Sequence, residues 1–258
     1  MSVTDWATES LELFRTKPPT VAARTSLAEL RRGGGTRLLY PVARVRGTWP
    51  MTIGGYRSEF LVRSPMDVER ARSANQEQPV MEFVLDGLDS ESVVWDVGAY
   101  HGHYTVHAAQ TGATVHAFEP VWESSQRLLA NAECNGVADR ILAWEIGLSD
   151  QHGVAQLSGP TPNQYQIRPA ETGVPVRTGD DLIRTHGLEV PDVMKIDVEG
   201  HEVAVLDGIG SVLSEIERVA VEVHDGCVDA VRERLQETHL VWKMGTERSE
   251  THLVGVSE

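Results

Sequence analysis

The pattern of apolar and polar positions changes at about residue 90. From residue 92 onward, short apolar runs alternate with segments whose apolar residues recur at helical spacing. We expect strands over 93–97, 114–118, 141–146, 192–197, 218–223, 239–244 and 251–256. We expect helices over 103–110, 123–134, 180–186, 201–214 and 226–237. This alternation predicts an α/β fold with a doubly wound, mostly parallel, seven-stranded Rossmann-like sheet that helices cover on both faces.

Residues 1–90 lack this alternation and predict an N-terminal α+β extension. Residues 51–62 favour a hairpin that turns at Gly54-Gly55. A capping box with proline at the first helical position predicts a short helix over 64–72, and a second helix follows from Pro79. The extension is therefore expected to hold a hairpin and two short helices.

The chain is expected to have two parts, an extension over 1–90 and a main domain over 91–258. We expect the extension to pack on the main domain and to cover the substrate site. Residues 151–178 break the alternation with Gly, Pro and Thr, and predict a hairpin or loop excursion near the rim of the sheet.

Composition limits the partners and the compartment. The net charge of −15 disfavours a nucleic-acid or anionic-membrane binder, because phosphates would be repelled at long range. Cys134 and Cys227 form no CxxC pair, which favours a reducing compartment. No run approaches the ~20 apolar residues that span a bilayer, and acidic residues stand where a signal peptide would carry positive charge. We therefore expect a cytoplasmic protein without a membrane span.

The segment from Asp96 to Gly102 has the pattern D-x-G-x-x-x-G between a buried strand and a helix. Gly98 allows a sharp turn, and Gly102 lets a ligand or the next helix approach the backbone. Because Asp96 would repel a pyrophosphate, the loop disfavours a nicotinamide dinucleotide and suits a cationic ligand. S-adenosylmethionine carries an ammonium and a sulfonium and no phosphate. The alternative is that both glycines merely form a strand-to-helix turn.

The next two strand ends extend this candidate cofactor site. Glu119 follows Gly98 by 21 positions, where a carboxylate can accept hydrogen bonds from both hydroxyls of a ribose. After the third strand, the backbone of Gly147 and Leu148 is placed to flank an adenine. The residues expected to bind S-adenosylmethionine are Asp96, Gly98, Ala99, Tyr100, Gly102, Tyr104, Glu119, Gly147 and Leu148.

Several segments, taken in order and spacing, resemble the FkbM family of methyltransferases. They are 94–105, 118–120, 178–182, 194–202, which contains Lys-Ile-Asp-Val-Glu-Gly, and 206–208. The resemblance implies a class I methyltransferase fold and methyl transfer to an oxygen, commonly a hydroxyl of a sugar or a secondary metabolite. The chain departs from the family at Gly179, where leucine is usual, and at Tyr100-His101, where smaller residues are common.

The fourth and fifth strands bring candidate catalytic residues to the same rim. Asp197 ends the fourth strand and Glu199 follows on the turn, while Glu222 and His224 share one face of the fifth. A neutral hydroxyl is a poor nucleophile, so His224 or Asp197 is expected to accept its proton, with Glu199 orienting the acceptor. Alternatively, Glu199 only stabilises a helix N-terminus, or positioning alone drives the transfer.

A metal site at this rim is a second alternative. Asp197, Glu199, Glu222 and His224 would offer magnesium a hard, oxygen-rich site. His101 and His103 lack further ligands at the spacing of a zinc site. We favour a site without metal.

The sequence therefore predicts a methyltransferase that uses S-adenosylmethionine to O-methylate a hydroxyl of a small-molecule or glycan acceptor. One alternative acceptor is a carboxylate, as in a uronic acid. A non-catalytic cofactor-binding protein and a nucleotide-dependent oxidoreductase are the rivals from other classes. The pattern names neither the individual acceptor nor an oligomeric state.

Overall fold

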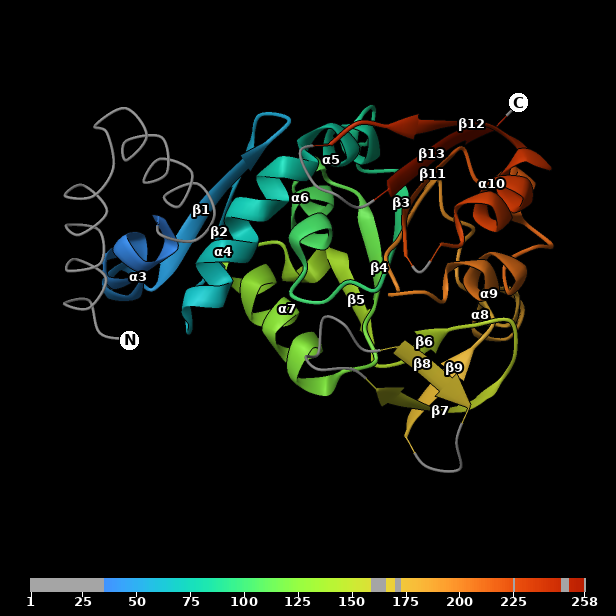
Figure 1. Ribbon diagram of the computed structural model, residues 1–258, viewed down its shortest axis with the longest axis horizontal. Helices are drawn as coiled ribbons and strands as arrows, with labels where there is room; N and C mark the ends of the chain where they lie inside the picture. Colours follow the sequence, from blue (N-terminus) through green and yellow to red (C-terminus); the bar gives the residue numbers. More distant parts are fainter. Residues whose placement is uncertain (1–34, 159–165, 170–172, 225, 247–250, 258) are drawn as a thin grey trace, which may run out of the picture. The chain divides into compact units, whose positions relative to one another are not determined.

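The computed structural model describes residues 35–158, 166–169, 173–224, 226–246 and 251–257. Its central sheet has seven strands in the order β12-β13-β11-β10-β3-β4-β5 (Figure 1). The strands are β3 Val93–Val97, β4 Thr114–Phe118, β5 Ile141–Trp144, β10 Val193–Ile196, β11 Arg218–Val223, β12 His239–Met244 and β13 Thr251–Ser257. Neighbouring strands from β11 to β5 pair in parallel, whereas β13 is antiparallel to β11 and β12. The predicted fold class is confirmed.

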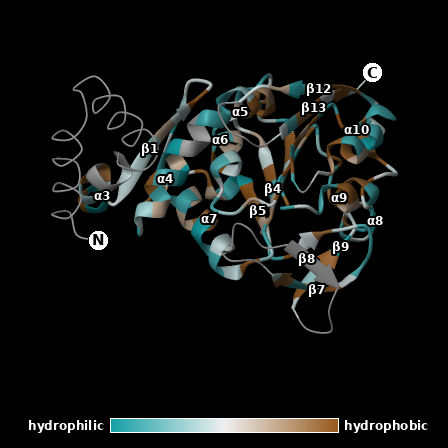
Figure 2. Cartoon of the chain, viewed as in Figure 1, coloured by the Kyte–Doolittle hydropathy of each residue, from teal (hydrophilic) through white to brown (hydrophobic). Residues whose placement is uncertain are grey.

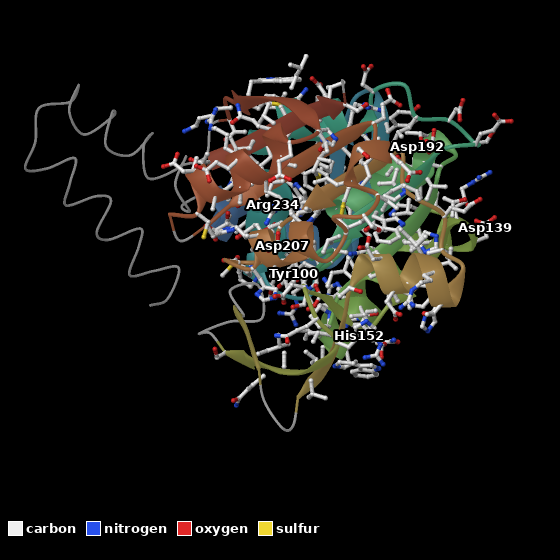
Figure 3. The ribbon with its side chains drawn as sticks, turned by 90° about the vertical axis from the view of Figure 1, so that its right-hand side faces the viewer. Tyr100, Asp139, His152, Asp192, Asp207 and Arg234 are labelled. Carbon is white, nitrogen blue, oxygen red and sulfur yellow. The ribbon has the colours of Figure 1, made fainter. Side chains whose placement is uncertain are left out.

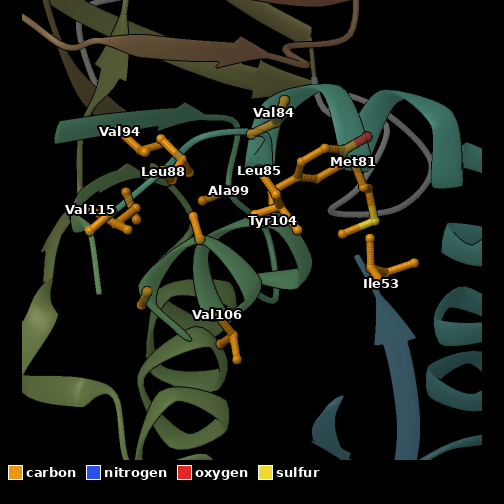
Figure 4. Close-up of a cluster of buried hydrophobic side chains, with 14 of the residues drawn as sticks. Ile53, Met81, Val84, Leu85, Leu88, Val94, Ala99, Tyr104, Val106 and Val115 are labelled. Atoms are coloured by element: carbon orange, nitrogen blue, oxygen red, sulfur yellow. The ribbon is translucent and has the colours of Figure 1, made fainter. Parts of the chain in front are cut away.

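Helices cover both faces of this sheet. They are α5 Gln78–Leu85, α6 His103–Thr111, α7 Trp122–Cys134, α8 Gly179–His186, α9 Glu202–Asp207 and α10 Val228–Gln236. Because side chains alternate along a strand, Val94 packs in one cluster with Val106 of α6, and Trp95 packs in another with Leu206 of α9. Figure 4 shows part of the first cluster, and the sheet strands carry much of the hydrophobic colour in Figure 2.

The predicted helix over 201–214 is interrupted. Helix α9 ends at Asp207, and a 3-10 helix, η5 Leu213–Glu215, follows the turn. A Cβ at Gly208 would lie 1.9 Å from the carbonyl oxygen of Ser149, so the backbones meet where the helix ends. Arg234 of α10 contacts Asp207 at 2.5 Å between Nη2 and Oδ1, and both are labelled in Figure 3.

A smaller sheet occupies the region where the alternation breaks. Its strands are β6 Gly147–Leu148, β7 Gly153–Ser158, β8 Gln166–Pro169 and β9 Val174–Arg177, in the order β6-β9-β7-β8. Strand β7 is antiparallel to both β8 and β9, so the excursion does contain a hairpin. The predicted third strand over 141–146 is shorter in the structure, since β5 ends at Trp144, and β6 beyond it joins the smaller sheet.

The N-terminal region contains α3 Gly35–Arg46, β1 Thr48–Ile53, β2 Tyr56–Leu61, α4 Pro65–Ala74 and η2 Asn75–Glu77. The hairpin turns at Gly54-Gly55, as predicted, with both φ angles positive. The described residues divide into two compact units, one of residues 35–49 and 61–71 and the other of residues 50–60 and those described from 72 onward. In the first unit, Ala43, Val62 and Val68 form a small apolar cluster. A boundary at residue 90 and a covering role for the extension stay predictions.

Residues 1–34, the first part of the predicted extension, lie outside the described residues. Among the helices that are described, none has the length and apolar content to cross a bilayer.

Candidate active site

The loop from β3 to α6 is shaped by two glycines. Gly98 has φ +79°, and a Cβ there would lie 1.8 Å from the carbonyl oxygen of Asp197. Gly102 has φ +81°, and its Cβ would lie 2.8 Å from Cγ of Leu128. The amides of Gly98 and Ala99 both donate to the carbonyl of Phe118, at 2.9 and 3.1 Å. Both glycines are therefore required by packing within the protein, whatever ligand the loop holds.

Asp96 fixes the start of α6. Its Oδ2 accepts hydrogen bonds from the amide of Thr105 at 3.0 Å and from the Thr105 hydroxyl at 2.5 Å. Its Oδ1 is buried without a hydrogen-bond partner among the described residues, and Lys195 Nζ lies 3.9 Å from it. Asp96 thus holds the loop in position through Oδ2, and its Oδ1 lies near the positively charged Lys195.

Glu119 connects the loop to the end of β4. Its Oε2 accepts from the amide of Tyr100 at 2.8 Å and its Oε1 from the amide of Val121 at 2.9 Å. Burial raises the pKa of Glu119 to about 7, although both amide bonds oppose the shift. Each carboxylate oxygen can accept more than one hydrogen bond. Glu119 therefore retains acceptor capacity beside the loop.

The remaining predicted cofactor residues differ in their surroundings. The ring of Tyr100 stacks on His101 with 3.7 Å between centroids, and Figure 3 labels Tyr100. Ala99 is buried in the core cluster. Gly147 and Leu148 are buried in β6, where they pair with Val176 and Arg177 of β9.

Tyr104 is directed into the core. Its hydroxyl donates to Glu77 Oε2 at 3.0 Å, and it lies in the apolar cluster beside Met81 and Leu85 (Figure 4). Lys195 Nζ is 4.8 Å from the ring centroid. The hydroxyl of Tyr104 is therefore engaged within the protein.

The ends of β3, β10 and β11 meet at one rim, because Ile196 pairs with both Val97 and Val221. Asp197 follows β10 directly, and its amide donates to the carbonyl of Val97 at 2.9 Å. Lys195 Nζ donates to Asp197 Oδ2 at 3.2 Å. Asp197, Glu199, Glu222 and His224, which the sequence pointed to separately, are brought together here. We call them, with Glu202, the rim cluster.

His224 is the centre of the rim cluster. Its Nδ1 lies 2.9 Å from Glu202 Oε1. Its Nε2 lies 3.5 Å from Glu222 Oε1, 3.6 Å from Glu199 Oε2 and 4.0 Å from Asp197 Oδ1. Burial lowers the pKa of His224, but the hydrogen bonds to Glu202 and Glu222 and the charges of Asp197 and Glu199 outweigh it and raise the pKa to about 11. Both ring nitrogens face carboxylates.

Two carboxylates of the rim cluster also have raised pKa values, and here burial is the main cause. Burial raises the pKa of Asp197 to about 6, although the charge of Lys195 opposes the shift. Burial also raises the pKa of Glu199 to about 7, against the charge of His224. Glu199 has φ +54°, a strained backbone conformation that places its side chain beside His224.

Two residues at this rim were not predicted to belong to the site. Glu202 is fully buried, accepts from the amide of Gly200 at 2.9 Å, and holds His224 Nδ1. The sequence did contain a signal for Glu202, because it ends the segment Asp197–Glu202, which is part of the family resemblance. Lys195 pairs with carboxylates. Its place as a single lysine inside a buried strand was the signal, because a buried ammonium needs a carboxylate partner. His201, also within this segment, contacts the hydroxyl of Ser149 at 2.9 Å.

Comparisons with known proteins bear on this arrangement. A family model described as the methyltransferase FkbM domain matches residues 96–240. The chain is 31% identical over 187 residues to the hexuronic acid methyltransferase AglP of Haloferax volcanii, covering 70% of this chain and 77% of that protein. It is 30% identical over 172 residues to the 31-O-demethyl-FK506 methyltransferase FkbM of Streptomyces tacrolimicus, covering 52% and 65%.

Similarity to solved structures is more distant. The crystal structure of an rRNA methylase from Streptococcus thermophilus is 16% identical with a TM-score of 0.49, and the match covers 70% of this chain and 96% of that chain.

Proposed function

Because this chain belongs to the FkbM family of methyltransferases, we propose that it methylates an oxygen atom of a sugar, a glycan or a secondary metabolite. It is an S-adenosylmethionine-dependent methyltransferase. One observation carries the assignment of the site: Lys195 Nζ contacts Asp96 of the cofactor loop and Asp197 of the rim cluster, at 3.9 and 3.2 Å. The loop and the rim cluster thus adjoin, as transfer from one ligand to another requires.

The residues at the loop fit the charge of S-adenosylmethionine. Carboxylates of Asp96, Glu119 and Asp197 surround the ends of β3, β4 and β10, which suits an ammonium and a sulfonium and would repel a pyrophosphate. We assign Glu119 to the ribose hydroxyls and the Gly98–Gly102 backbone to the methionine moiety. The backbone of Gly147 and Leu148 is assigned to the adenine. When bound, the cofactor supplies a methyl group activated by a positively charged sulfur.

Tyr104 is assigned a supporting role rather than a direct contact with the cofactor. Its hydroxyl is bonded to Glu77, and its ring is packed in the core. Asp96 likewise acts mainly through the hydrogen bonds that fix α6. These two assignments narrow the set of residues that the sequence suggested.

The acceptor must lose its hydroxyl proton during the transfer. Both ring nitrogens of His224 face carboxylates. Neither nitrogen therefore has a free lone pair with which to take a proton from the methyl acceptor. We therefore assign the proton to Asp197 or Glu199, whose side chains are partly exposed. His224 holds these carboxylates in place. Of the two expected proton acceptors, His224 and Asp197, this assignment keeps Asp197, and it adds Glu199, which was expected to orient the acceptor.

Two acceptor chemistries are supported by relatives. The name of one relative specifies a hexuronic acid, and that of the other a demethylated FK506. A neutral hydroxyl can approach the rim cluster without electrostatic cost. An ionised uronate would be repelled by Asp197, Glu199 and Glu222 unless a cation accompanied it. A hydroxyl is therefore the first candidate and a uronate carboxylate the second.

Two measurements test the function. Calorimetry with S-adenosylmethionine, S-adenosylhomocysteine and NAD should show binding of the first two, and binding of NAD alone would contradict the assignment. Transfer of an isotopically labelled methyl group to glycosides, uronic acids and hydroxylated macrolides should yield a labelled product. Mild alkali then separates the acceptors, because a methyl ester is hydrolysed and a methyl ether is not. No product with any acceptor would favour a cofactor-binding protein without catalysis.

We further propose a cytoplasmic location and acceptors other than nucleic acid. Neither Cys134 nor Cys227 forms a disulfide with a described residue, in keeping with a reducing compartment. The net charge of −15 opposes binding to phosphodiester backbones.

A further inference from the structure

We propose that Asp197, Glu199 and His224 bind a divalent metal ion, and that Mn²⁺ matches their donor atoms best. The binding site is inferred from these side chains alone, whereas the role of the ion in methyl transfer rests on the proposed function. The proposal revises the expectation of a site without metal.

The donor atoms are already close together. One donor atom from each of the three residues lies within 4.8 Å of the others. His224 Nε2 is 3.6 Å from Glu199 Oε2 and 4.0 Å from Asp197 Oδ1. Donors at about 2.1 Å from an octahedral ion are about 3.0 Å apart when adjacent and about 4.2 Å apart when opposite. Small side-chain movements would therefore form the site.

The orientation of His224 is that of a metal ligand. Metal-binding histidines usually donate their second ring nitrogen to a carboxylate, which fixes the ring and its tautomer. Here Nδ1 lies 2.9 Å from Glu202, which is fully buried and also accepts the amide of Gly200. This leaves Nε2 directed at Glu222, Glu199 and Asp197, and the last two supply the partly exposed carboxylates of the site. An ion would take the place of the Nε2 proton.

The charges of the rim cluster call for a cation. Four carboxylates, those of Asp197, Glu199, Glu202 and Glu222, have an oxygen within 4.0 Å of a His224 ring nitrogen. Glu202 Oε2 is buried without a hydrogen-bond partner among the described residues. An ionised carboxylate in such surroundings is costly unless positive charge compensates it. This oxygen belongs to the carboxylate that orients His224, so additional positive charge at Nε2 would also offset the burial of Glu202.

The donor set selects the metal. Carboxylates suit magnesium, calcium and manganese, whereas imidazole suits transition metals, and manganese is the transition metal among the ions that carboxylates favour. A magnesium site of oxygen ligands alone does not account for a histidine directed into the cluster. The three side chains are 17–30% exposed, so an acceptor can reach the remaining coordination positions.

An ion here would explain how an acidic rim accepts an oxygen-rich or anionic acceptor. It would bind hydroxyl or carboxylate oxygens of the acceptor and offset the repulsion from Asp197 and Glu199. A uronate would then become as suitable a substrate as a neutral sugar.

Electron paramagnetic resonance with Mn²⁺ tests the site directly. Protein freed of metal by chelation is titrated with MnCl₂, and loss of the six-line signal of free Mn²⁺ reports binding. We expect one tightly bound ion per chain, with pulsed spectra showing coupling to an imidazole nitrogen. Glu199→Gln and His224→Gln should weaken binding by at least about tenfold, and Glu202→Gln by about 10- to 100-fold. Glu233→Gln removes an exposed charge from α10 and should leave binding unchanged.

Several outcomes would overturn the proposal. They are the absence of saturable binding, the absence of nitrogen coupling, and binding that survives both Glu199→Gln and His224→Gln in proteins with unchanged circular dichroism. A second possible triad, Glu77, Glu222 and His252, is fully buried. Loss of binding in Glu77→Gln but not in Glu199→Gln would move the ion there and contradict the assignment.

The same preparations separate this inference from the proposed function. Binding of S-adenosylmethionine and methyl transfer by a protein that binds no Mn²⁺ would refute the metal site alone. Tight Mn²⁺ binding without transfer to any acceptor would refute the proposed function alone. The cofactor itself brings positive charge, so the titration is repeated with S-adenosylhomocysteine, which lacks the sulfonium. Nitrogen coupling should persist.

Discussion

Lys195 donates its Nζ to Asp197 Oδ2 over 3.2 Å from a position that is 5% exposed. The two residues are two positions apart, so their side chains leave the chain on the same side. The charges of Asp197, Asp96 and Glu222 outweigh the effect of burial and raise the pKa of Lys195 to about 12. Lys195 therefore stays charged and supplies positive charge to both the loop and the rim.

Replacing this ammonium should be costly. Lys195→Met leaves Asp96 and Asp197 without a cation between them, and breaking a buried ion pair from one side costs about 3–5 kcal/mol. We expect a loss of that order in the free energy of unfolding, measured with urea. Lys243→Met, at an exposed position of β12, should change it by less than about 0.5 kcal/mol. Equal effects of the two substitutions would contradict the role assigned to Lys195.

Cofactor affinity should depend on the ionisation of Glu119. Its pKa is raised to about 7, so the carboxylate becomes protonated as pH falls through 7. A protonated Glu119 accepts fewer hydrogen bonds from a ribose, and affinity should fall about tenfold between pH 8 and pH 6. Calorimetry with S-adenosylhomocysteine across this range measures the slope. Glu119→Gln should bind more weakly and without the slope; an unchanged slope in this variant would assign the titration to another group.

Gly98→Ala should lower the free energy of unfolding far more than the same substitution at Gly87. A Cβ at Gly98 would lie 1.8 Å from the Asp197 carbonyl, whereas a Cβ at Gly87, also with positive φ, meets nothing within 4 Å. Gly87→Ala should cost only the conformational strain of about 1–2 kcal/mol. We expect Gly98→Ala to exceed this in urea unfolding and to abolish binding of S-adenosylmethionine. Similar stabilities for the two variants would contradict the packing argument.

Tyr104→Phe separates a structural role from a role in cofactor binding. The change removes the donor to the buried Glu77 carboxylate and should destabilise the protein by about 1–3 kcal/mol. The Kd for S-adenosylmethionine should stay the same, since the hydroxyl is engaged in the core. Tyr40→Phe, which removes an exposed hydroxyl bonded to the Arg63 carbonyl, serves as the control. A weaker affinity with unchanged stability would return Tyr104 to the cofactor site.

The central strands and the position of the loop could be predicted because their signals are local. Runs such as Val93–Val97 and Arg218–Val223 are rich in valine, and their observed bounds match the prediction. The end of α9 at Gly208 could not be predicted in this way, because it depends on the Ser149 backbone 59 positions earlier. A contact between residues so far apart in the sequence produces no periodic pattern of apolar residues from which it could be predicted.

The same distinction applies to the candidate site. The motif residues Asp96, Glu119 and Asp197 could be found from their places at strand ends. The direction of the Tyr104 side chain could not, since it depends on Glu77, which lies outside the motif. The surroundings of His224 likewise combine residues from two separate segments, 197–202 and 222–224. A histidine at a strand end therefore suggested a base, whereas the structure surrounds both of its ring nitrogens with carboxylates.

The close approach of Gly98 to the Asp197 carbonyl has a consequence for engineering. In the proposed site, contact between two main-chain segments sets the spacing between the methyl donor and the acceptor, and an error of about 1 Å in such spacing is enough to slow a transfer strongly. Side chains around the acceptor can therefore be exchanged without changing that spacing. New acceptors can be sought by varying those side chains while Gly98 and the backbone at residue 197 are left untouched.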